Sequence, residues 1–509
     1  MSKKIQHIQG EVKFDNSGLS ADKLNADIFG LPLQAKLRLT DFTQPLLDIN
    51  LTAKPSLQVI VRLLKDKFKV VLPVDIEGQS YLSVDLQSQL VSTQPPAING
   101  YLDVLGAAVK IKNLDTPIES VNGRLGFSQS QISWQELNFK YSGIDYKTKG
   151  VLADFNAPCV ELELSSKDVS LRSKFSVNDK VINFSEINGK YLNSDFLFSG
   201  SIDAANPPQV KTNIAGQLNI DLGSLKDYLK KFKNQLDIIK PLGRVQVKFN
   251  LDGNVQDIKS CVLTAKINSK DLSLYGLKSE EFYMEYNQAD NLIDIPLVRL
   301  SLYDGIVNLS AKMNLAANDP PFWINADIKD VKLEKLKLDT PAKKEDISGI
   351  IQAQIKLNGY LSGVSKLNGA GEILISEGKL WQLNLFKGLG HLLFTQDFTN
   401  IVFSQGYCGF SVSDRLISSD NLKLKSNLAN ISGSLKIGFD SSIEAMLNVE
   451  VLDEAPLTGT FKDVTTAILG QAGKFGVIKI SGTLHEPKYR FKPAVVDIIK
   501  GLTDTFLKR

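Results

Sequence analysis

The sequence has little cysteine, no long apolar run and almost no excess of either charge. Its 509 residues include three cysteines, which stand far apart and form no CxxC pair: Cys159, Cys261 and Cys408. This spacing excludes a disulfide framework and a thiol-based metal or redox motif. No stretch approaches the roughly 18 apolar residues of a membrane-spanning helix, and the opening residues contain no apolar core of signal-peptide length. The net charge of +3 is too small and too evenly spread for a nucleic-acid-binding surface, so we set that class of protein aside.

Histidine is equally scarce, and no catalytic motif is present. The three histidines lie in distant parts of the chain and form no HExxH or HxH motif: His7, His391 and His485. A metal site is therefore not expected. Neither a G-x-S-x-G turn nor a phosphate-binding G-x-x-x-x-G-K-[ST] loop occurs. Carboxylates that are adjacent in sequence, such as Glu280 and Glu281, point to opposite faces of a strand and do not converge on one substrate. We expect neither enzymatic activity nor a bound cofactor.

Strict alternation of apolar and polar residues is the dominant pattern of the sequence. The stretch GLPLQAKLRLTDF, residues 30–42, places an apolar residue at every second position from Leu31 to Leu39. The same period recurs at 245–251 and 351–357. A period of two is typical of a strand with one apolar face. The sequence therefore predicts a mostly β protein, a long meander of antiparallel strands that are each polar on one face.

An internal repeat supports this interpretation. The offset that aligns Gly10 with Gly123 also aligns Phe14 with Phe127, and without any gap it gives 14 identities over positions 10–54. Composition alone would give roughly 3 identities over such a span. We place repeat copies near 7–56, 120–169 and 282–334. These copies predict a repetitive β region over 1–345, and the linker-like stretch TPAKKED at 340–346 leads from it to a separate C-terminal domain over 346–509.

A few segments follow the period of a helix instead. Apolar residues recur three and four apart, with lysines between them, in 56–69 and 222–240. The end of the chain, residues 492–509, shows a similar apolar stripe. We expect amphipathic helices that cover part of the sheet, with contact to a membrane surface as the alternative.

The order of short motifs in the C-terminal third resembles a known family. After the strand 372–376 the sequence predicts an acidic-glycine hairpin at Glu377 and Gly378. The motifs, in chain order, are Gly369-x-Gly371, the Gly378 turn before Leu380, Asp420-x-Leu422-x-Leu424, Gly433-x-Leu435, and Gly482-Thr483-Leu484 before Pro487. Together they resemble the C-terminal region of the AsmA-like family, which includes AsmA-type and TamB-type envelope proteins of diderm bacteria.

The resemblance implies a long, twisted antiparallel sheet folded into an open hydrophobic groove. Members of the family are anchored in the inner membrane by an N-terminal helix and cross the periplasm. They are regarded as bridge-like carriers of phospholipid toward the outer membrane. The expected partners are therefore phospholipid acyl chains, the two membranes and envelope proteins. The anchoring helix is missing from this sequence, so we expect the chain to be a fragment of a longer protein.

The apolar face of such strands can meet a second sheet, a helix or a ligand. In a sandwich the faces would close on each other and form a structural or adhesive repeat without cargo. In a groove they would line the path of acyl chains, although ordinary core packing is the alternative for every such residue. The predicted groove-lining residues are Leu33, Leu37, Leu39, Val84, Leu86, Phe127, Leu162, Phe198, Val247, Phe249, Leu302, Leu309, Ile355, Ile373, Ile375, Leu435 and Ile437.

Overall fold

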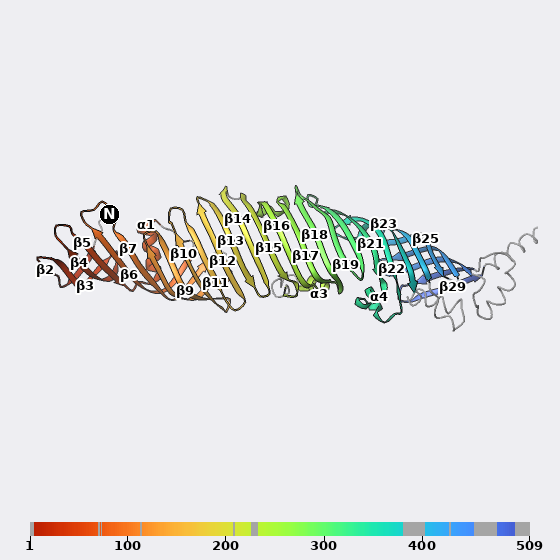
Figure 1. Cartoon of the computed structure of the whole chain (residues 1–509), viewed down its shortest axis with the longest axis horizontal. Helices are drawn as coiled ribbons and strands as arrows, with labels where there is room; N and C mark the ends of the chain where they lie inside the picture. Colours follow the sequence, from red (N-terminus) through yellow and green to blue (C-terminus); the bar gives the residue numbers. More distant parts are fainter. Residues whose placement is uncertain are drawn as a thin grey trace, which may run out of the picture. The chain divides into compact units, whose positions relative to one another are not determined.

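The chain forms a β-sheet protein in which helices are few. The computed structural model describes residues 5–69, 72, 74–111, 114–206, 209–224, 233–379, 403–426, 429–451 and 476–493. The strands of these residues belong to one open antiparallel sheet of 29 strands (Figure 1). This arrangement confirms the mostly β prediction. The chain divides into two compact units, residues 1–216 (unit 1) and 217–509 (unit 2), and the division expected at 345/346 stays a prediction.

Unit 1 is a meander in which each strand of the sheet pairs with the next one along the chain. The exception is its first edge, where β1 and β2 both pair with β3. The elements of unit 1 are β1 (Ile5–Gly10), β2 (Lys13–Asp15), β3 (Gly18–Ile28), β4 (Leu31–Thr40), β5 (Leu46–Ala53), α1 (Leu57–Phe68), β6 (Val74–Gln89), β7 (Ala97–Ile111), β8 (Ile118–Ser128), β9 (Gln131–Tyr141), β10 (Ile144–Ala153), β11 (Cys159–Ser165), β12 (Val169–Asn178), β13 (Val181–Tyr191) and β14 (Ser194–Asn206); β15 (Gln209–Asp221) crosses into unit 2.

Unit 2 is also a meander of consecutive antiparallel strands. Its elements are η1 (Leu222–Ser224), α3 (Lys233–Ile239), β16 (Leu242–Asn254), η3 (Val255–Ser260), β17 (Val262–Leu274), β18 (Leu277–Ala289), β19 (Leu292–Leu302), β20 (Gly305–Asn314), β21 (Pro321–Lys332), α4 (Leu333–Leu336), η4 (Lys337–Asp339), η5 (Pro341–Lys344), β22 (Ser348–Tyr360), β23 (Gly363–Lys379), β24 (Phe403–Ser413), β25 (Leu416–Ser426), β26 (Ala429–Gly438), β27 (Ile443–Val451), β28 (Gly476–Gly482) and β29 (Pro487–Pro493). In Figure 1, α3 and α4 lie at the strand ends of this unit.

Short turns with positive φ connect many of the strands. Two consecutive residues with positive φ match the type I′ turn, whose twist suits a two-residue hairpin. Glycine, asparagine and aspartate tolerate this conformation best, and each of these turns contains at least one of them. The pairs are Phe29 and Gly30, Ser142 and Gly143, Tyr275 and Gly276, Asp290 and Asn291, Tyr303 and Asp304, and Asp414 and Arg415.

In the structure, the first two copies of the internal repeat pair their strands in the same register. Gly10 lies opposite Leu24, and its counterpart Gly123 lies opposite Leu137. The same bulge follows in both copies. The positive φ values recur as well, because Asp41 and Asp154 both have φ of 56°. The strands β1 to β5 and β8 to β11 are therefore two copies of one structural unit.

The structure describes only some residues of the three segments that were predicted to be helical. A helix forms as α1 within 56–69, and η1 and α3 form at the two ends of 222–240, whose residues 225–232 lie outside the described residues. Lys492 and Pro493 belong to β29, and the rest of the closing segment lies outside the described residues as well.

The hairpin predicted at Glu377 and Gly378 is wrong. The strand β23 runs on to Lys379, and its register with β22 shifts between Ser348 and Ile350. Glu377 has a φ of 51°, which is the positive φ of a bulge residue rather than of a chain reversal. An acidic-glycine pair satisfies a bulge as well as a hairpin, so the motif did not distinguish them.

Candidate functional site

The strand register places the candidate residues of unit 1 on one face of the sheet. Directly opposed residues form a continuous apolar row from β3 to β14, which we call row 1: Leu24, Ala35, Leu51, Val84, Gly100, Phe127, Ile132, Leu152, Val160, Phe175, Phe184 and Gly200. Two candidates are members of this row, Val84 and Phe127. The others stand two or four positions from a member and therefore share its face: Leu33, Leu37, Leu39, Leu86, Leu162 and Phe198.

Unit 2 contains a second row built in the same way. From β16 to β24 the opposed residues of row 2 are Val247, Ile267, Met284, Val298, Leu309, Ala326, Ile355, Gly371 and Phe410. Val247, Leu309 and Ile355 are candidates within the row. Phe249, Leu302, Ile373, Ile375, Leu435 and Ile437 lie beside it on the same face, the last two through the register of β24 to β26.

All seventeen candidate residues are half-buried. None of them belongs to the fully buried core, and none is among the exposed large hydrophobic residues. A side chain between two covered layers is normally lost from solvent, whereas one on a single open sheet is shielded only by its neighbours in the sheet. The other members of rows 1 and 2 are also half-buried, except Phe184 of row 1, which is 8% exposed and belongs to the buried core.

Glycines opposite aromatic rings recur along this face, and the sequence interpretation missed them. At each such glycine a Cβ would collide with the ring on the neighbouring strand, so the ring occupies the space above the glycine. The pairs are Gly100 and Phe127, Gly150 and Trp134, Gly189 and Phe196, Gly359 and Phe322, and Gly371 and Phe410. The available signal was a glycine at a position where the alternation requires an apolar residue. These pairs keep large rings close to the sheet.

The helix α1 covers part of the apolar face in unit 1. Its residue Leu57 is 6% exposed and packs with Val104 and Ala107 of β7. Val104 stands four positions from the row member Gly100, so it lies on the face of row 1. At the other end of the helix, Lys67 Nζ lies 5.0 Å from the centre of the Phe29 ring. In unit 1, then, helix α1 shields the apolar face along β7.

A sealed cluster occupies the same face at the C-terminal end of unit 2. We call it the C-terminal cluster, and it consists of Leu422, Leu424, Ala429, Ile431, Ile443, Ala445, Leu447, Val449, Ile478 and Ile480. Ile443 and Leu447 are each 1% exposed. The candidates Ile375, Leu435 and Ile437 pack against this cluster. These three residues therefore border a closed core, whereas the candidates of β4 to β22 do not.

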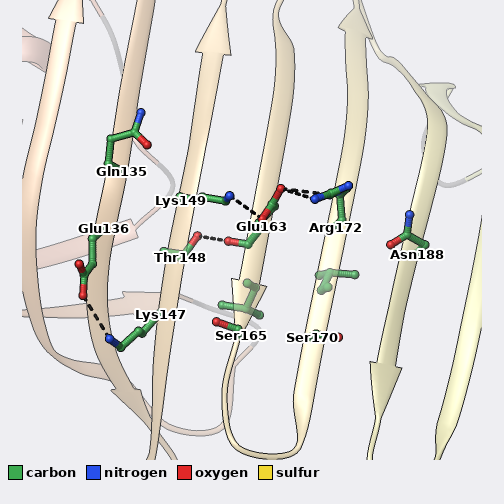
Figure 2. A pocket seen from close by; sticks show the side chains of 12 residues that line it. Gln135, Glu136, Lys147, Thr148, Lys149, Glu163, Ser165, Ser170, Arg172 and Asn188 are labelled. Carbon is green, nitrogen blue, oxygen red and sulfur yellow. Dashed lines mark hydrogen bonds and ion pairs between the residues drawn. The ribbon is translucent and has the colours of Figure 1, made fainter.

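The opposite face of the sheet is polar and carries cross-strand ion pairs. Around a shallow hollow of about 420 Å³ on β9 to β13, Glu163 accepts hydrogen bonds from Lys149 and Arg172, at 2.9 Å and 2.7 Å (Figure 2). The bond from Lys149 lowers the pKa of the Glu163 carboxyl, and Arg172 adds to this effect. Thr148, which the register places on the apolar face beside Trp134, donates from its Oγ1 to the carbonyl oxygen of Glu163 at 2.8 Å. The two ion pairs of Glu163 join three strands, as in a ladder that ties strands together.

The part of the chain that the structure describes contains no group of three or more His, Cys, Asp or Glu residues that could hold a metal ion. Among the same residues, no helix is both long enough and apolar enough to cross a bilayer.

No protein-family model, no curated protein and no solved structure matches the chain.

Proposed function

We propose that the apolar face of this sheet binds the acyl chains of phospholipids and passes them along the protein. On this proposal the protein belongs to the cell envelope of a diderm bacterium and carries phospholipid between the inner and outer membranes. The resemblance to AsmA-like proteins suggests this role. The observation that carries it is the continuity of rows 1 and 2, which keep apolar residues in register from strand to strand within each unit.

Most side chains of rows 1 and 2 are half-buried rather than enclosed. Such a surface suits the passage of acyl chains better than their storage. Covering apolar surface stabilises by about 25 cal/mol per Å². An acyl chain that leaves a bilayer for a floor of Leu, Val, Ile and Phe exchanges one apolar environment for another, so its transfer free energy is close to zero. A deep enclosed pocket would instead hold its ligand. The glycine and aromatic pairs favour a smooth path, because a ring above a glycine projects less into the space over the sheet.

The contrast between the polar face and the apolar face of the sheet also supports the proposal. Gln34, Lys36 and Arg38 of β4 are exposed, whereas Leu37 on the other face is half-buried. A sheet with this arrangement keeps a wet outer face and an apolar inner face. The C-terminal cluster favours a different role for its own region, since its sealed side chains have no room for cargo. We therefore restrict the conduit to the strands before it.

Photocrosslinking tests the proposal directly. The purified chain is incubated with phosphatidylcholine and phosphatidylglycerol vesicles that contain a phospholipid with a diazirine on its acyl chain. After illumination, modified residues are located by mass spectrometry. We expect adducts on the rows, for example at Val84 and Val247, and none on the polar face. A folded protein without adducts on the rows would identify a structural or adhesive repeat instead.

A matched pair of variants controls for charge and stability. Val247→Asp places a carboxylate in row 2, whereas Gln246→Asp places one on the opposite face of the same strand. We expect Val247→Asp to reduce acyl-chain adducts at least fivefold and Gln246→Asp to leave them within twofold. Circular dichroism should show the same strand content in both variants. Unfolding of Val247→Asp alone would show that row 2 is a packed core and would contradict the proposal.

A further inference from the structure

The strands β1 and β2 lie at an edge of the sheet, but together they match the interior strand β8 in extent and register. At the repeat offset, Ile5 corresponds to Ile118 and Asp15 to Ser128, which are the limits of β8. The bulge after Gly10 has its counterpart after Gly123, in the middle of β8. The strand β8 is paired on both sides, with β7 and with β9. Among the described residues, β1 and β2 pair only with β3.

Apolar residues on this edge are exposed where their counterparts are covered. Ile8, Val12 and Phe14 are 62%, 52% and 73% exposed. Their counterparts in β8 are half-buried beside β7: Val121, Leu125 and Phe127. The ring of Phe14 lies 5.6 Å from that of Phe42, which is itself 46% exposed. An edge strand normally carries charges or proline that discourage pairing, and this one presents a row of large apolar side chains.

The pairing of β7 with β8 shows which residues an added strand would place against this edge. In β7, Gly100 lies opposite Phe127 and leaves room for its ring, and Leu102 lies opposite Leu125. Ala107 lies opposite Val121. Transferred to the edge by the repeat, these positions require an antiparallel strand with glycine opposite Phe14 and a leucine-sized residue opposite Val12. A small apolar residue belongs opposite Ile8.

The two copies carry opposite charges at one position, and this reversal determines which partner strand fits the edge. Arg124 of β8 donates two hydrogen bonds to Asp103 of β7, at 2.6 Å and 2.9 Å, and lies over the Tyr101 ring at 3.8 Å. The counterpart of Arg124 on the edge is Glu11, which is exposed and makes no ion pair with the described residues. The complementary strand therefore carries a lysine or arginine where β7 carries Asp103.

We propose that β1 and β2 form the docking edge for an antiparallel strand contributed by a polypeptide segment outside residues 1–509, which extends the sheet by β-augmentation. That strand alternates apolar and polar residues, presents glycine to Phe14 and presents a basic residue to Glu11. Main-chain hydrogen bonds supply the affinity, and the side chains on the two faces select the partner. This surface is independent of whether the apolar rows carry lipid.

Two synthetic peptides test the register and the charge. Both have the sequence of β7, residues 97–111, with a fluorophore at one end, and one contains Asp103→Lys. Binding to the full chain is followed by fluorescence anisotropy. We expect the lysine peptide to bind at least tenfold more tightly than the unmodified one. In the variant Glu11→Arg, which restores the charge of Arg124, the preference should reverse. Failure of the reversal, or no binding of either peptide, would overturn the proposal.

Hydrogen exchange locates the bound peptide. Amides within residues 5–15 should exchange more slowly in the complex, while those of β29 should not change. Glu280→Lys is the matched control, because Glu280 is an exposed carboxylate on the interior strand β18. It should leave the preference for the lysine peptide unaltered. Protection at β29 instead of residues 5–15, or a lost preference in Glu280→Lys, would show non-specific edge or charge binding and would contradict the proposal.

Discussion

Row 1 and the C-terminal cluster both consist of apolar residues at alternate positions of their strands, but the side chains of the two groups differ in burial. Leu37 of β4 and Leu447 of β27 both stand between two exposed neighbours on their strands. Leu37 is half-buried, whereas Leu447 is 1% exposed. Leu447 lies between Gly433 and Ile478 of the flanking strands and belongs to a cluster bordered by Tyr489 and Phe491. Alternation thus decides which face a side chain occupies, and the packing above that face decides whether it becomes core.

The largest expected effect tests this difference in packing. Leu447→Ala should destabilise its region by about 3 kcal/mol, because it removes buried methyl groups and leaves a cavity. Leu37→Ala should cost about 1 kcal/mol, since its side chain is half-exposed already. Amide hydrogen exchange in β27 and in β4 measures each region separately. Equal losses at the two sites would mean that row 1 is as sealed as the C-terminal cluster.

A second comparison uses the two copies of the repeat. Gly10 and Gly123 have φ of 152° and 143°, and a Cβ at either would clash with the backbone of the next strand. Gly123→Ala should destabilise by about 2 kcal/mol, because β8 is held on both sides. Gly10→Ala should cost less, since an edge strand can shift away. Denaturant titration of both variants gives the two values. A larger loss at Gly10 would show that the edge is already held by another strand.

The ion pair between Asp103 and Arg124 should contribute modestly and only above acid pH. The hydrogen bond from Arg124 lowers the pKa of the Asp103 carboxyl, so the folded protein keeps this charge at a pH where the unfolded chain takes up a proton. The contribution is complete above about pH 4 and is lost as the pH falls further. Asp103→Asn should cost about 1 kcal/mol or less at pH 7. Asp145→Asn, at a more exposed pair, is the control for thermal unfolding across pH 3 to 7.

The smallest effect is expected on the polar face. Glu163→Gln removes the acceptor of Lys149 and Arg172, but the pair is exposed to water and screened by salt. The midpoint of denaturant unfolding should remain within the error of the measurement, and so should acyl-chain crosslinking. A reduced yield of adducts on row 1 in this variant would show that the ladder supports the apolar face as well as the outer one.

Much of the candidate site was accessible from alternation alone. The period of two placed Val84 on the apolar face of unit 1 and Val247 on that of unit 2, and the register within each unit agrees with that placement. The constant offset between Gly10 and Gly123 identified the repeat. The hairpin expected at Glu377 and Gly378 was wrong because a bulge and a turn use the same residue types. The pairing of glycines with aromatic rings escaped notice, since it joins residues on different strands and has no local signature.

By itself the sequence determined the strands, their two faces and the repeat, because these depend on local periodicity and on neighbours along the chain. Only the tertiary structure decided which apolar residues are sealed and which stay half-exposed. Burial depends on what lies above a face, and the residues that cover Leu447 come from other strands and connections. The same holds for the edge at β1 and β2, where strand pairing, rather than the residues themselves, distinguishes Phe14 from Phe127.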